Sequence, residues 1–485
     1  MSANLLDPTG TPTASVVTAL RAHGLGGVTA QGQDAICAAL GATPTLADSW
    51  IAIAVLSRML PTEGEVRLAH RGTRTVGIPQ FVANAVAQGL RGAARHRTVE
   101  LVDSAVIVDV RHTSETDLAT GIQRVARETV ARWDSEHDIV LVTWTDDGKS
   151  MRRLMPVERA TALHAAPPVH GSTREADKRI VVPVGGHYLL PELAAEVWRT
   201  ERVAALAQFS GATTAVIGFD CVPLTTAETV GDGMPAAFAR NLGAVAHMTR
   251  VGAISQAAAI EYGGWRSMLA GVGIAGPDIR AVMLAAEPRS ATDADAAEFA
   301  QLAGLDELPL VLVVGSHEPR KNHMAVLHAA ELLWQEGREF RLVFIGGNSW
   351  NSLDFSDAVE RLRLAGRQVV ALSSLADSML WAAYRLARFS VFPSINEGFG
   401  LPIAESISSG TPVVTSSYGS MREVGDGNGA LLVDSRDDAA IATGIRTLLA
   451  DEKTYQRLVT ETAGYTVRSW AEYADDLWAY FVESA

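Results

Sequence analysis

Cysteine is scarce in this chain, and its two residues, Cys37 and Cys221, cannot form a disulfide framework. A reducing compartment therefore fits the composition. Long apolar runs are also missing, because the best stretch, residues 50–56, is far shorter than the roughly 18 residues that a membrane-spanning helix needs. The N-terminus has no basic segment followed by an apolar one. We therefore expect no signal peptide and a cytoplasmic protein.

Positive charge is in deficit as well. The formal net charge is −14, which argues against nucleic acid as a general partner. Apolar residues make up 48% of the chain and charged residues 20%, as in globular proteins. A chain of 485 residues is too long for a single core, so we expect two or three domains.

The first 98 residues differ from the rest, because their pattern predicts helices and contains no catalytic motif. Helices are expected over residues 14–23, 33–40, 46–60 and 79–90. Residues 78–97 could form an amphipathic helix with a basic end, which is compatible with peripheral contact to an anionic membrane through residues 66–98. The alternative, which we favour, is a helical extension packed on the following domain.

From about residue 104, apolar strands alternate with helices. The strands are expected at residues 105–110, 139–144, 180–184, 214–218 and 253–255. This alternation predicts a parallel sheet covered by helices on both faces. Ligands of such sheets bind beyond the carboxyl ends of the strands.

That rule selects three loops in the first half of the chain. Their candidate residues are Thr120 and Gly121, His187, and Asp220. Each has a structural alternative: Thr120 and Gly121 could only start a helix, His187 could be an ordinary loop histidine, and Asp220 could cap a turn.

A polar, acidic segment over residues 288–306 is expected to join the two halves. It contains Asp293 and Asp295, spaced like the carboxylates that hold a metal in some nucleotide-sugar enzymes. Aspartates are also common at helix N-termini, and a helix is expected from about Ala294. We therefore interpret the pair as caps and predict no metal site.

A second set of strands is expected at residues 310–315, 341–346, 369–372, 389–392 and 413–415, followed by helices at 437–450, 452–464 and 470–483. The loop after the first of these strands carries Arg320 and Lys321 just before a helix. Cations are disfavoured at a helix N-terminus by its dipole. Two of them together therefore indicate that an anion binds there.

The stretch from Glu397 to Glu405 follows another strand of this half. Gly398 and Gly400 delay the start of the next helix, so Glu397 lies on the loop and Glu405 about one turn into the helix. The N–H groups of Phe399, Gly400 and Leu401 should then point outward at a helix N-terminus, where anions bind. The structural alternative is a capped helix with two solvated glutamates.

Five segments together carry a family resemblance. They are Gly315-Ser-His-Glu-Pro-Arg-Lys-Asn322, Pro393-Ser394, Glu397-Gly-Phe-Gly-Leu-Pro-Ile-Ala-Glu405, Gly410-Thr-Pro-Val-Val414 and Glu423-Val424. Their order and spacing resemble the signature of retaining GT-B glycosyltransferases of family GT4. The front half resembles the family more loosely, through residues 120–125 and 217–224.

The resemblance implies an α/β fold with two Rossmann-like parallel-sheet domains facing a cleft, and it leaves the helical N-terminal region outside. The expected divisions are residues 1–98 for the extension, 99–290 for the acceptor-side domain, 291–468 for the nucleotide-sugar domain and 469–485 for a helix that crosses back to the first domain.

The resemblance also implies roles for individual residues. Arg320 and Lys321 would hold the donor's diphosphate, Glu397 would contact the transferred sugar, and Glu405 would accept hydrogen bonds from the ribose. The remaining donor-site residues would be Ser316, Gly398, Phe399, Gly400 and Leu401. Because fixed cations would stabilise the leaving group, the resemblance implies neither a metal nor a cofactor.

We therefore expect a glycosyltransferase that moves a sugar from a nucleotide-diphosphate sugar to a glycan or lipid-linked acceptor, in cell-surface polysaccharide synthesis. It would be cytoplasmic or peripheral at the inner face of the membrane. The alternatives are a non-catalytic scaffold of the same shape, a sugar-nucleotide epimerase, and a phosphorylase. A scaffold would be expected to lose Arg320, Lys321 or Glu397, and all three are present.

Overall fold

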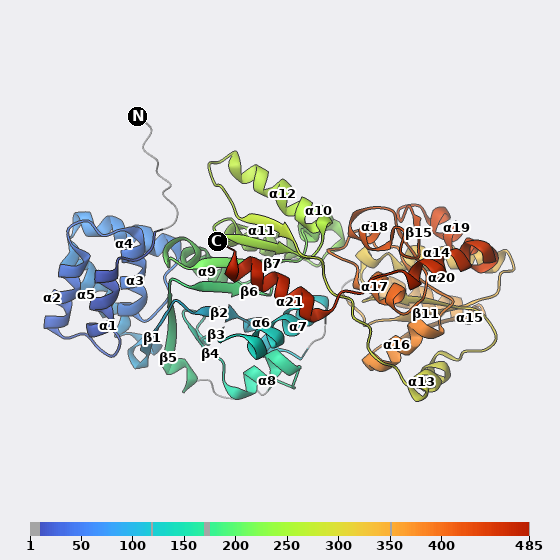
Figure 1. Ribbon diagram of the computed structural model, residues 1–485, viewed down its shortest axis with the longest axis horizontal. Helices are drawn as coiled ribbons and strands as arrows, with labels where there is room; N and C mark the ends of the chain where they lie inside the picture. Colours follow the sequence, from blue (N-terminus) through green and yellow to red (C-terminus); the bar gives the residue numbers. More distant parts are fainter. Residues whose placement is uncertain (1–9, 118–119, 169–174, 350–351, 485) are drawn as a thin grey trace.

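The computed structural model describes residues 10–117, 120–168, 175–349 and 352–484. A bundle of helices comes first in the chain and lies at one end of the molecule, beyond the first sheet and away from the C-terminal domain (Figure 1). Its elements are α1 (Ala14–His23), α2 (Ala30–Leu40), α3 (Leu46–Ser57), α4 (Glu63–Thr75), α5 (Ile78–Gly89) and the 3-10 helix η1 (Gly92–His96).

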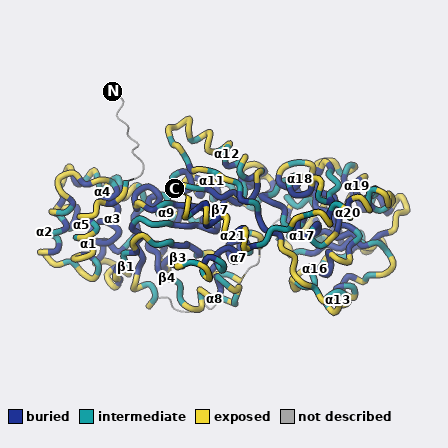
Figure 2. The backbone as a smooth tube through the Cα atoms, viewed as in Figure 1, coloured by how far each residue is buried: buried dark blue, intermediate teal, exposed yellow. Residues whose placement is uncertain are grey.

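Helix α3 is the centre of this bundle. It is apolar on all sides, and all but its first residue are buried, so it is enclosed by the other helices and the first sheet (Figure 2). Thr45 caps its N-terminus in a capping box with Asp48. The bundle and the first sheet share one continuous hydrophobic core, which includes Trp50, Phe81 and Phe209. The favoured sequence interpretation, an extension packed on the next domain, is confirmed.

Two local predictions for this region are wrong. Helix α4 was not expected, although Thr62 and Glu65 form a capping box at its start. The helix expected over residues 79–90 is present as α5, but the possible amphipathic helix over residues 78–97 is not formed. Helix α5 ends at Gly89, which packs so closely on α3 that a Cβ atom there would lie 2.3 Å from the carbonyl oxygen of Leu56. The basic residues that follow therefore lie on η1 or flank it, and not on an amphipathic helix.

The first sheet has nine strands in the order β1-β5-β4-β3-β2-β6-β7-β8-β9, and only β4 runs antiparallel to its neighbours. The strands are β1 (Thr98–Asp103), β2 (Val106–Asp109), β3 (Ile139–Trp144), β4 (Met151–Arg153), β5 (Arg179–Val184), β6 (His187–Leu190), β7 (Thr213–Gly218), β8 (Arg250–Ala253) and β9 (Asp278–Ala281). Its helices are α6 (Arg111–Glu115), α7 (Gly121–Glu136), α8 (Pro156–His164), η2 (Ala176–Lys178), α9 (Val197–Phe209), α10 (Val222–Thr225), η3 (Ala227–Thr229), α11 (Met234–Val245) and α12 (Gln256–Ala270).

The placement of His187 on a loop at the carboxyl edge is wrong. Strands β1 and β2 follow one another directly, as do β5 and β6, with kinks at Ser104 and at Gly185 and Gly186, which have positive φ angles. His187 is the first residue of β6 and pairs with Val106. The carboxyl end of this strand comes at Leu190, so His187 lies at the opposite end from the loops that bind ligands.

The second sheet has six parallel strands in the order β12-β11-β10-β13-β14-β15. They are β10 (Leu310–Val314), β11 (Arg341–Ile345), β12 (Val369–Leu372), β13 (Phe389–Phe392), β14 (Val413–Ser416) and β15 (Ala430–Val433). The helices are α13 (Asp293–Ala303), η4 (Pro319–Lys321), α14 (His323–Gln335), α15 (Leu353–Leu364), α16 (Asp377–Leu386), α17 (Leu401–Ser408), α18 (Gly419–Gly425), α19 (Asp438–Ala450) and α20 (Glu452–Ala463). At the start of α13, Thr292 is the N-cap, and Asp295 accepts hydrogen bonds from it in a capping box. One of the two aspartates interpreted as caps therefore stabilises the helix start, and Asp293 is the first residue of the helix.

The last helix returns to the first sheet, as expected. Helix α21 (Trp470–Trp478) continues as the π-helix η5 (Ala479–Glu483) and lies against α7 and the first sheet (Figure 1). Trp133 donates a hydrogen bond to the carbonyl of Ala474 at 3.0 Å. A Cβ atom on Gly252 of β8 would lie 2.6 Å from Leu477, so this glycine makes room for the helix. Among the described residues, every helix is too short or too polar to cross a bilayer.

Candidate functional site

Two loops of the second sheet meet at its carboxyl edge because their strands are neighbours. Strand β10 pairs with β13, so the loop over residues 315–322 lies beside the loop over residues 393–400. Arg320 donates a hydrogen bond to the carbonyl of Asn396 at 2.9 Å, and Ile395 donates one to the carbonyl of Arg320. The two motif-bearing loops therefore form one structure.

Glu397 lies between the two cations that the sequence singled out. Lys321 Nζ is 2.6 Å from one carboxylate oxygen, and an Arg320 nitrogen is 2.6 Å from the other. Ser394 donates a further hydrogen bond at 2.6 Å. Burial alone would raise the pKa of Glu397, but the two cations and these hydrogen bonds lower it to about 2. The carboxylate is therefore ionised at neutral pH.

Neither cation is a solvated loop residue. The side chains of Arg320 and Lys321 are 16% and 11% exposed. Arg320 also pairs with Glu318 at 2.6 Å, and the Lys321 ammonium lies 5.0 Å from the centre of the Phe392 ring. Burial lowers the pKa of Lys321, and Glu397 opposes that shift. Both cations are therefore largely buried and paired, and neither is a solvated surface charge.

Helix α17 begins beside this cluster, as predicted. Gly400 is its N-cap and has a φ of 94°, in the left-handed region that favours glycine. The amides of Phe399, Gly400 and Leu401 donate no hydrogen bond to a residue that the structure describes. These groups form a helix N-terminus that can take an anion.

Helix α7 of the first domain starts opposite α17. Thr120 is its N-cap, and its hydroxyl donates to the side chain of Gln123. A Cβ atom on Gly121 would lie 3.9 Å from Leu401, which places the two helix N-termini against each other. Thr120 and Gly121 therefore start a helix, as the structural alternative has it, and this helix begins at the domain interface; their role near a ligand stays a prediction.

Glu405 is buried, with 4% of its surface exposed, and is already engaged. Arg124 of α7 pairs with one of its oxygens at 2.6 Å, and the Tyr384 hydroxyl donates to the other at 3.2 Å. Arg124 was not among the predicted site residues. Only its position four residues after Thr120, in a loop already singled out, could have suggested it.

Asp220 reaches the same interface from the carboxyl end of β7. A Cβ atom on Gly398 would lie 3.0 Å from an Asp220 oxygen and 2.4 Å from the carbonyl of Phe219. Burial raises the pKa of Asp220 to about 6, with Arg320 opposing and Glu261 and Glu397 adding to the rise. Asp220 also accepts a hydrogen bond from the amide of Val222 at 3.1 Å, so it caps the turn that starts α10, as the structural alternative has it, and in addition it lies in the field of the cation cluster.

Further contacts hold the domains together around the site. Ser255, at the start of α12, donates to the carbonyl of Gly398 at 2.6 Å. Glu423 of α18 accepts from the amides of Gln256 and Ala257 at 2.9 and 3.0 Å, so a carboxylate of one domain caps a helix of the other.

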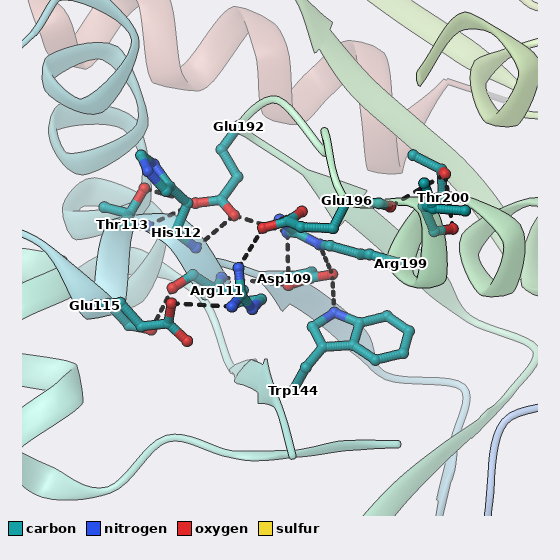
Figure 3. Close-up of polar contacts among 12 residues, drawn as sticks. Asp109, Arg111, His112, Thr113, Glu115, Trp144, Glu192, Glu196, Arg199 and Thr200 are labelled. Carbon is teal, nitrogen blue, oxygen red and sulfur yellow. Dashed lines mark hydrogen bonds and ion pairs between the residues drawn. The ribbon is translucent and has the colours of Figure 1, made fainter. Parts of the chain in front are cut away.

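A buried polar cluster fixes the loops at the carboxyl end of the first sheet (Figure 3). Arg199 is fully buried between Asp109, at the end of β2, and Glu192, which follows β6. Glu192 also accepts from the backbone amides of His112 and Thr113 at 2.8 Å. The His112 ring in turn contacts Gln123 of α7 at 2.9 Å. The cluster thus positions the N-terminus of α7. The sequence analysis did not identify it.

No metal centre is evident in the described ranges. Among those residues, no three His, Cys, Asp or Glu side chains are grouped so that they could hold an ion. Asp295, once a candidate ligand, is bonded to Thr292 and to Ser378.

Comparison with known proteins agrees with this geometry. Residues 295–464 match the family described as glycosyl transferases group 1. O-antigen chain mannosyltransferase B of Escherichia coli is 39% identical over 142 residues, which cover 29% of this chain and 37% of the relative. D-inositol 3-phosphate glycosyltransferase of Nocardia farcinica is 34% identical over 192 residues, or 38% of this chain and 42% of the relative. The chain thus spans less than half the length of these relatives.

The fold is that of the GT-B glycosyltransferases. Anabaena HepE, solved in complex with UDP and glucose, superposes with a TM-score of 0.56 at 13% identity, covering 79% of this chain and all of HepE. Sucrose-phosphate synthase from Thermosynechococcus elongatus superposes with a TM-score of 0.53 at 14% identity, covering 78% of this chain and 96% of that protein.

Proposed function

We propose that this chain is a retaining glycosyltransferase that uses a nucleotide-diphosphate sugar, and the match of residues 295–464 to the glycosyl transferases group 1 family supports this. One observation carries the proposal. Two buried cations, Arg320 and Lys321, share a single carboxylate where the N-termini of α7 and α17 meet. Cations and helix N-termini that converge on one point provide a site for a dianionic diphosphate.

The same groups would stabilise the reaction's leaving group. In the transfer, the bond from the sugar's anomeric carbon to the diphosphate breaks, and an acceptor hydroxyl bonds to that carbon on the same face. The hydroxyl proton passes to the departing phosphate oxygen. Negative charge develops on the diphosphate, so fixed cations and amides placed around it lower the barrier without a metal.

Glu397 and Glu405 would bind the two ends of the donor. Glu397 lies beside the cations and would accept hydrogen bonds from the sugar hydroxyls after the diphosphate takes over part of its contact with Arg320 and Lys321. Glu405 lies at the other side of α17 and would accept from the ribose. For that, the ribose hydroxyls must replace Arg124 on the carboxylate.

The acceptor is proposed to be a glycan or a lipid-linked sugar of the cell surface. Support comes from the relative named as an O-antigen chain mannosyltransferase. The acceptor would enter between the domains, near Asp220 and the loop that starts α7. A cytoplasmic enzyme with peripheral contact to the inner membrane face through residues 66–98 would suit such an acceptor.

Turnover by a single-cation variant tests the proposal. In the presence of chelator, we expect the purified protein to release nucleoside diphosphate from one class of UDP-, GDP-, ADP- or TDP-sugar. NMR of the glycosylated product should show the same anomeric configuration as in the donor sugar. Lys321→Gln should lower kcat by roughly 100-fold or more, because it removes a charge that stabilises the leaving group. Lys453→Gln, at an exposed site, is the matched control. Equal turnover by both variants would reject the role of Lys321.

A further inference from the structure

A second site lies in the N-terminal bundle, at the end of the molecule away from the C-terminal domain (Figure 1). It is a cavity of about 670 Å³ between α4 and α5, with α3 and η1 at its base. This volume falls in the range of small-molecule pockets, roughly 300–1,000 Å³. We call it the α4–α5 groove. Its apolar lining includes Ile53, Met59, Leu60, Leu68, Val76 and Phe81.

Small residues of both helices contribute to the lining of the groove. Helix α4 presents Ala69 and Gly72 at helical spacing, and α5 presents Ala85. A Cβ atom on Gly72 would meet no other atom within 4 Å. These small residues leave the space between the larger lining side chains unfilled, so apolar surface is accessible from outside.

The charged residues around the groove leave an excess of positive charge. Its two lining carboxylates are engaged, since Glu65 caps α4 through Thr62 and Asp147 pairs with Arg97 at 2.8 Å. Its three lining cations, Arg91, Lys149 and Arg202, form no salt bridge with any residue that the structure describes. The Nε atom of Arg202 is buried without a hydrogen-bond partner among those residues.

The surface around the groove is apolar and basic as well. Leu68, Val76 and Leu90 are 72%, 58% and 62% exposed. Residues 66–98 contain six arginines and no aspartate or glutamate, although the whole chain has a net charge of −14. Arg67 and Arg97 pair with Glu63 and Asp147, and the other four arginines form no salt bridge with a described residue. Exposed apolar side chains near such cations are typical of surfaces that lie in the headgroup region of an anionic bilayer.

We propose that the α4–α5 groove binds the hydrocarbon chain of an anionic membrane lipid, with the lipid phosphate on Arg91, Lys149 and Arg202. The apolar lining accommodates the chain, and the cations compensate the headgroup charge. This site would attach the enzyme to the membrane at a fixed place, and it does not depend on the identity of the sugar donor.

Vesicle flotation with the full chain tests the proposal. The probes are vesicles of phosphatidylcholine alone and of phosphatidylcholine with phosphatidylglycerol. Gly72→Leu fills the groove without changing charge, and leucine favours a helix more than glycine does, so the fold should persist. Gly264→Leu, at another helix glycine with no atom near its Cβ, is the matched control. Arg91→Gln with Lys149→Gln removes two of the cations.

Wild type and Gly264→Leu should float with the phosphatidylglycerol vesicles only, and both Gly72→Leu and the double charge variant should lose at least tenfold in vesicle affinity. Unchanged vesicle binding by Gly72→Leu, together with loss of binding by the charge variant, would mean that the protein is held only by electrostatic attraction to the membrane surface. That result would reject lipid binding in the groove. Lipid binding in the groove would also be rejected if the wild type did not float with either kind of vesicle. A dimer detected by sedimentation and abolished only by Gly72→Leu would reject it as well, because the groove would then bind a second copy of the chain. Nucleotide-sugar binding is measured on the same preparations, so that a failure of lipid binding can be distinguished from a failure of the proposed glycosyl transfer.

Discussion

Glu397 determines the charge balance of the candidate site. Its carboxylate is one anion shared by Arg320 and Lys321, and all three side chains are at least four-fifths buried. Removing one member of a buried charge cluster leaves its partners uncompensated, which typically costs about 3–5 kcal/mol. A bound diphosphate would bring two further negative charges to the same place. The site is therefore stable without donor and still has cations that a diphosphate can engage.

Asp220 should make stability depend on pH in a defined direction. Its pKa rises from 3.8 to about 6 on folding, so between these values the folded state binds the proton and the unfolded state does not. The free energy of unfolding that Asp220 contributes therefore falls as pH rises through this window.

Asp220→Asn removes that dependence. Relative to wild type, the variant should gain on the order of 2 kcal/mol in unfolding free energy between about pH 4 and pH 7, since one pKa unit corresponds to about 1.4 kcal/mol. Urea denaturation at both pH values measures the gap. A gap of the same size at both would show that Asp220 titrates normally.

Arg124 and Glu405 can be separated by their effects on the donor. Glu405→Gln should raise the donor's KM by about tenfold or more, because a charged hydrogen bond is worth about 1.5–3 kcal/mol. Arg124→Met should not raise it, because Arg124 only occupies Glu405 before the ribose arrives. Steady-state kinetics on both variants gives the answer. An equal rise in the donor's KM in both variants would show that the Arg124–Glu405 pair supports the structure of the site and that Glu405 does not contact the ribose.

The residues of the candidate site could be predicted where the motif is local. Glu397, Arg320, Lys321 and Glu405 were singled out from loop and helix positions alone, although their catalytic and binding roles stay predictions. The partners of these residues could not be predicted, because Arg124 is 281 positions from Glu405 and only the folded domains bring them together.

At the scale of elements, the approach of the β13–α17 loop to the first domain depends on Gly398. The carbonyl oxygen of Phe219 packs directly against Gly398, and a Cβ atom added at Gly398 would lie only 2.4 Å from that oxygen. Ser255 then donates to the Gly398 carbonyl across the interface. A side chain here would have to push one loop away from the other.

Gly398→Ala should therefore open the domain interface. Overpacking of this kind costs typically 1–3 kcal/mol, so we expect a lower melting temperature and a larger radius of gyration in small-angle scattering. Gly264→Ala, where the Cβ atom meets open space, should change neither radius nor closure. An unchanged radius in Gly398→Ala would show that the interface can absorb the methyl group.

Elements with long apolar runs were predictable and short or bent ones were not. The predicted strand over residues 139–144 is β3, and the strand 389–392 is β13. Strands β4 and β9 were missed because they are short and carry arginines. Strand β6 was missed because Gly185 and Gly186 were interpreted as a loop after β5. They form a short bend, and β6 begins directly after it, so His187 was placed at the wrong end of a strand.

At the scale of the whole molecule, the N-terminal bundle is part of the first domain's core. Leu60 donates to the carbonyl of Lys149 at 2.8 Å, and Val99 to that of Leu25 at 3.1 Å. Trp50 is fully buried in the cluster that also contains the first sheet's Val142 and Tyr188. The bundle is therefore more than a recruitment module attached to an independent enzyme.

Deleting residues 1–97 should accordingly expose one face of that core. We expect an insoluble or molten product, read out by solubility and by loss of near-ultraviolet circular dichroism. A soluble fragment with a cooperative unfolding transition and full nucleotide-sugar binding would contradict this and would make the bundle an independent appendage.

The two-sheet architecture could be predicted from alternating strands and helices, but the closure of the domains could not. Closure depends on single contacts between distant residues, such as Glu423 capping α12 and Arg289 bridging Glu128 and Asp377. No local pattern in the sequence marks such pairs, because each residue also has an ordinary surface interpretation.

Binding of a nucleotide-sugar at the Arg320–Lys321 cluster is the central claim, and calorimetric titration tests it most directly. UDP-, GDP-, ADP- and TDP-sugars would be titrated in chelator into wild type, Lys321→Gln and the control Lys453→Gln. The account predicts that one class of nucleotide binds wild type and Lys453→Gln alike and binds Lys321→Gln at least tenfold more weakly. Equal affinity for all three proteins, or binding of no nucleotide-sugar at all, would contradict it.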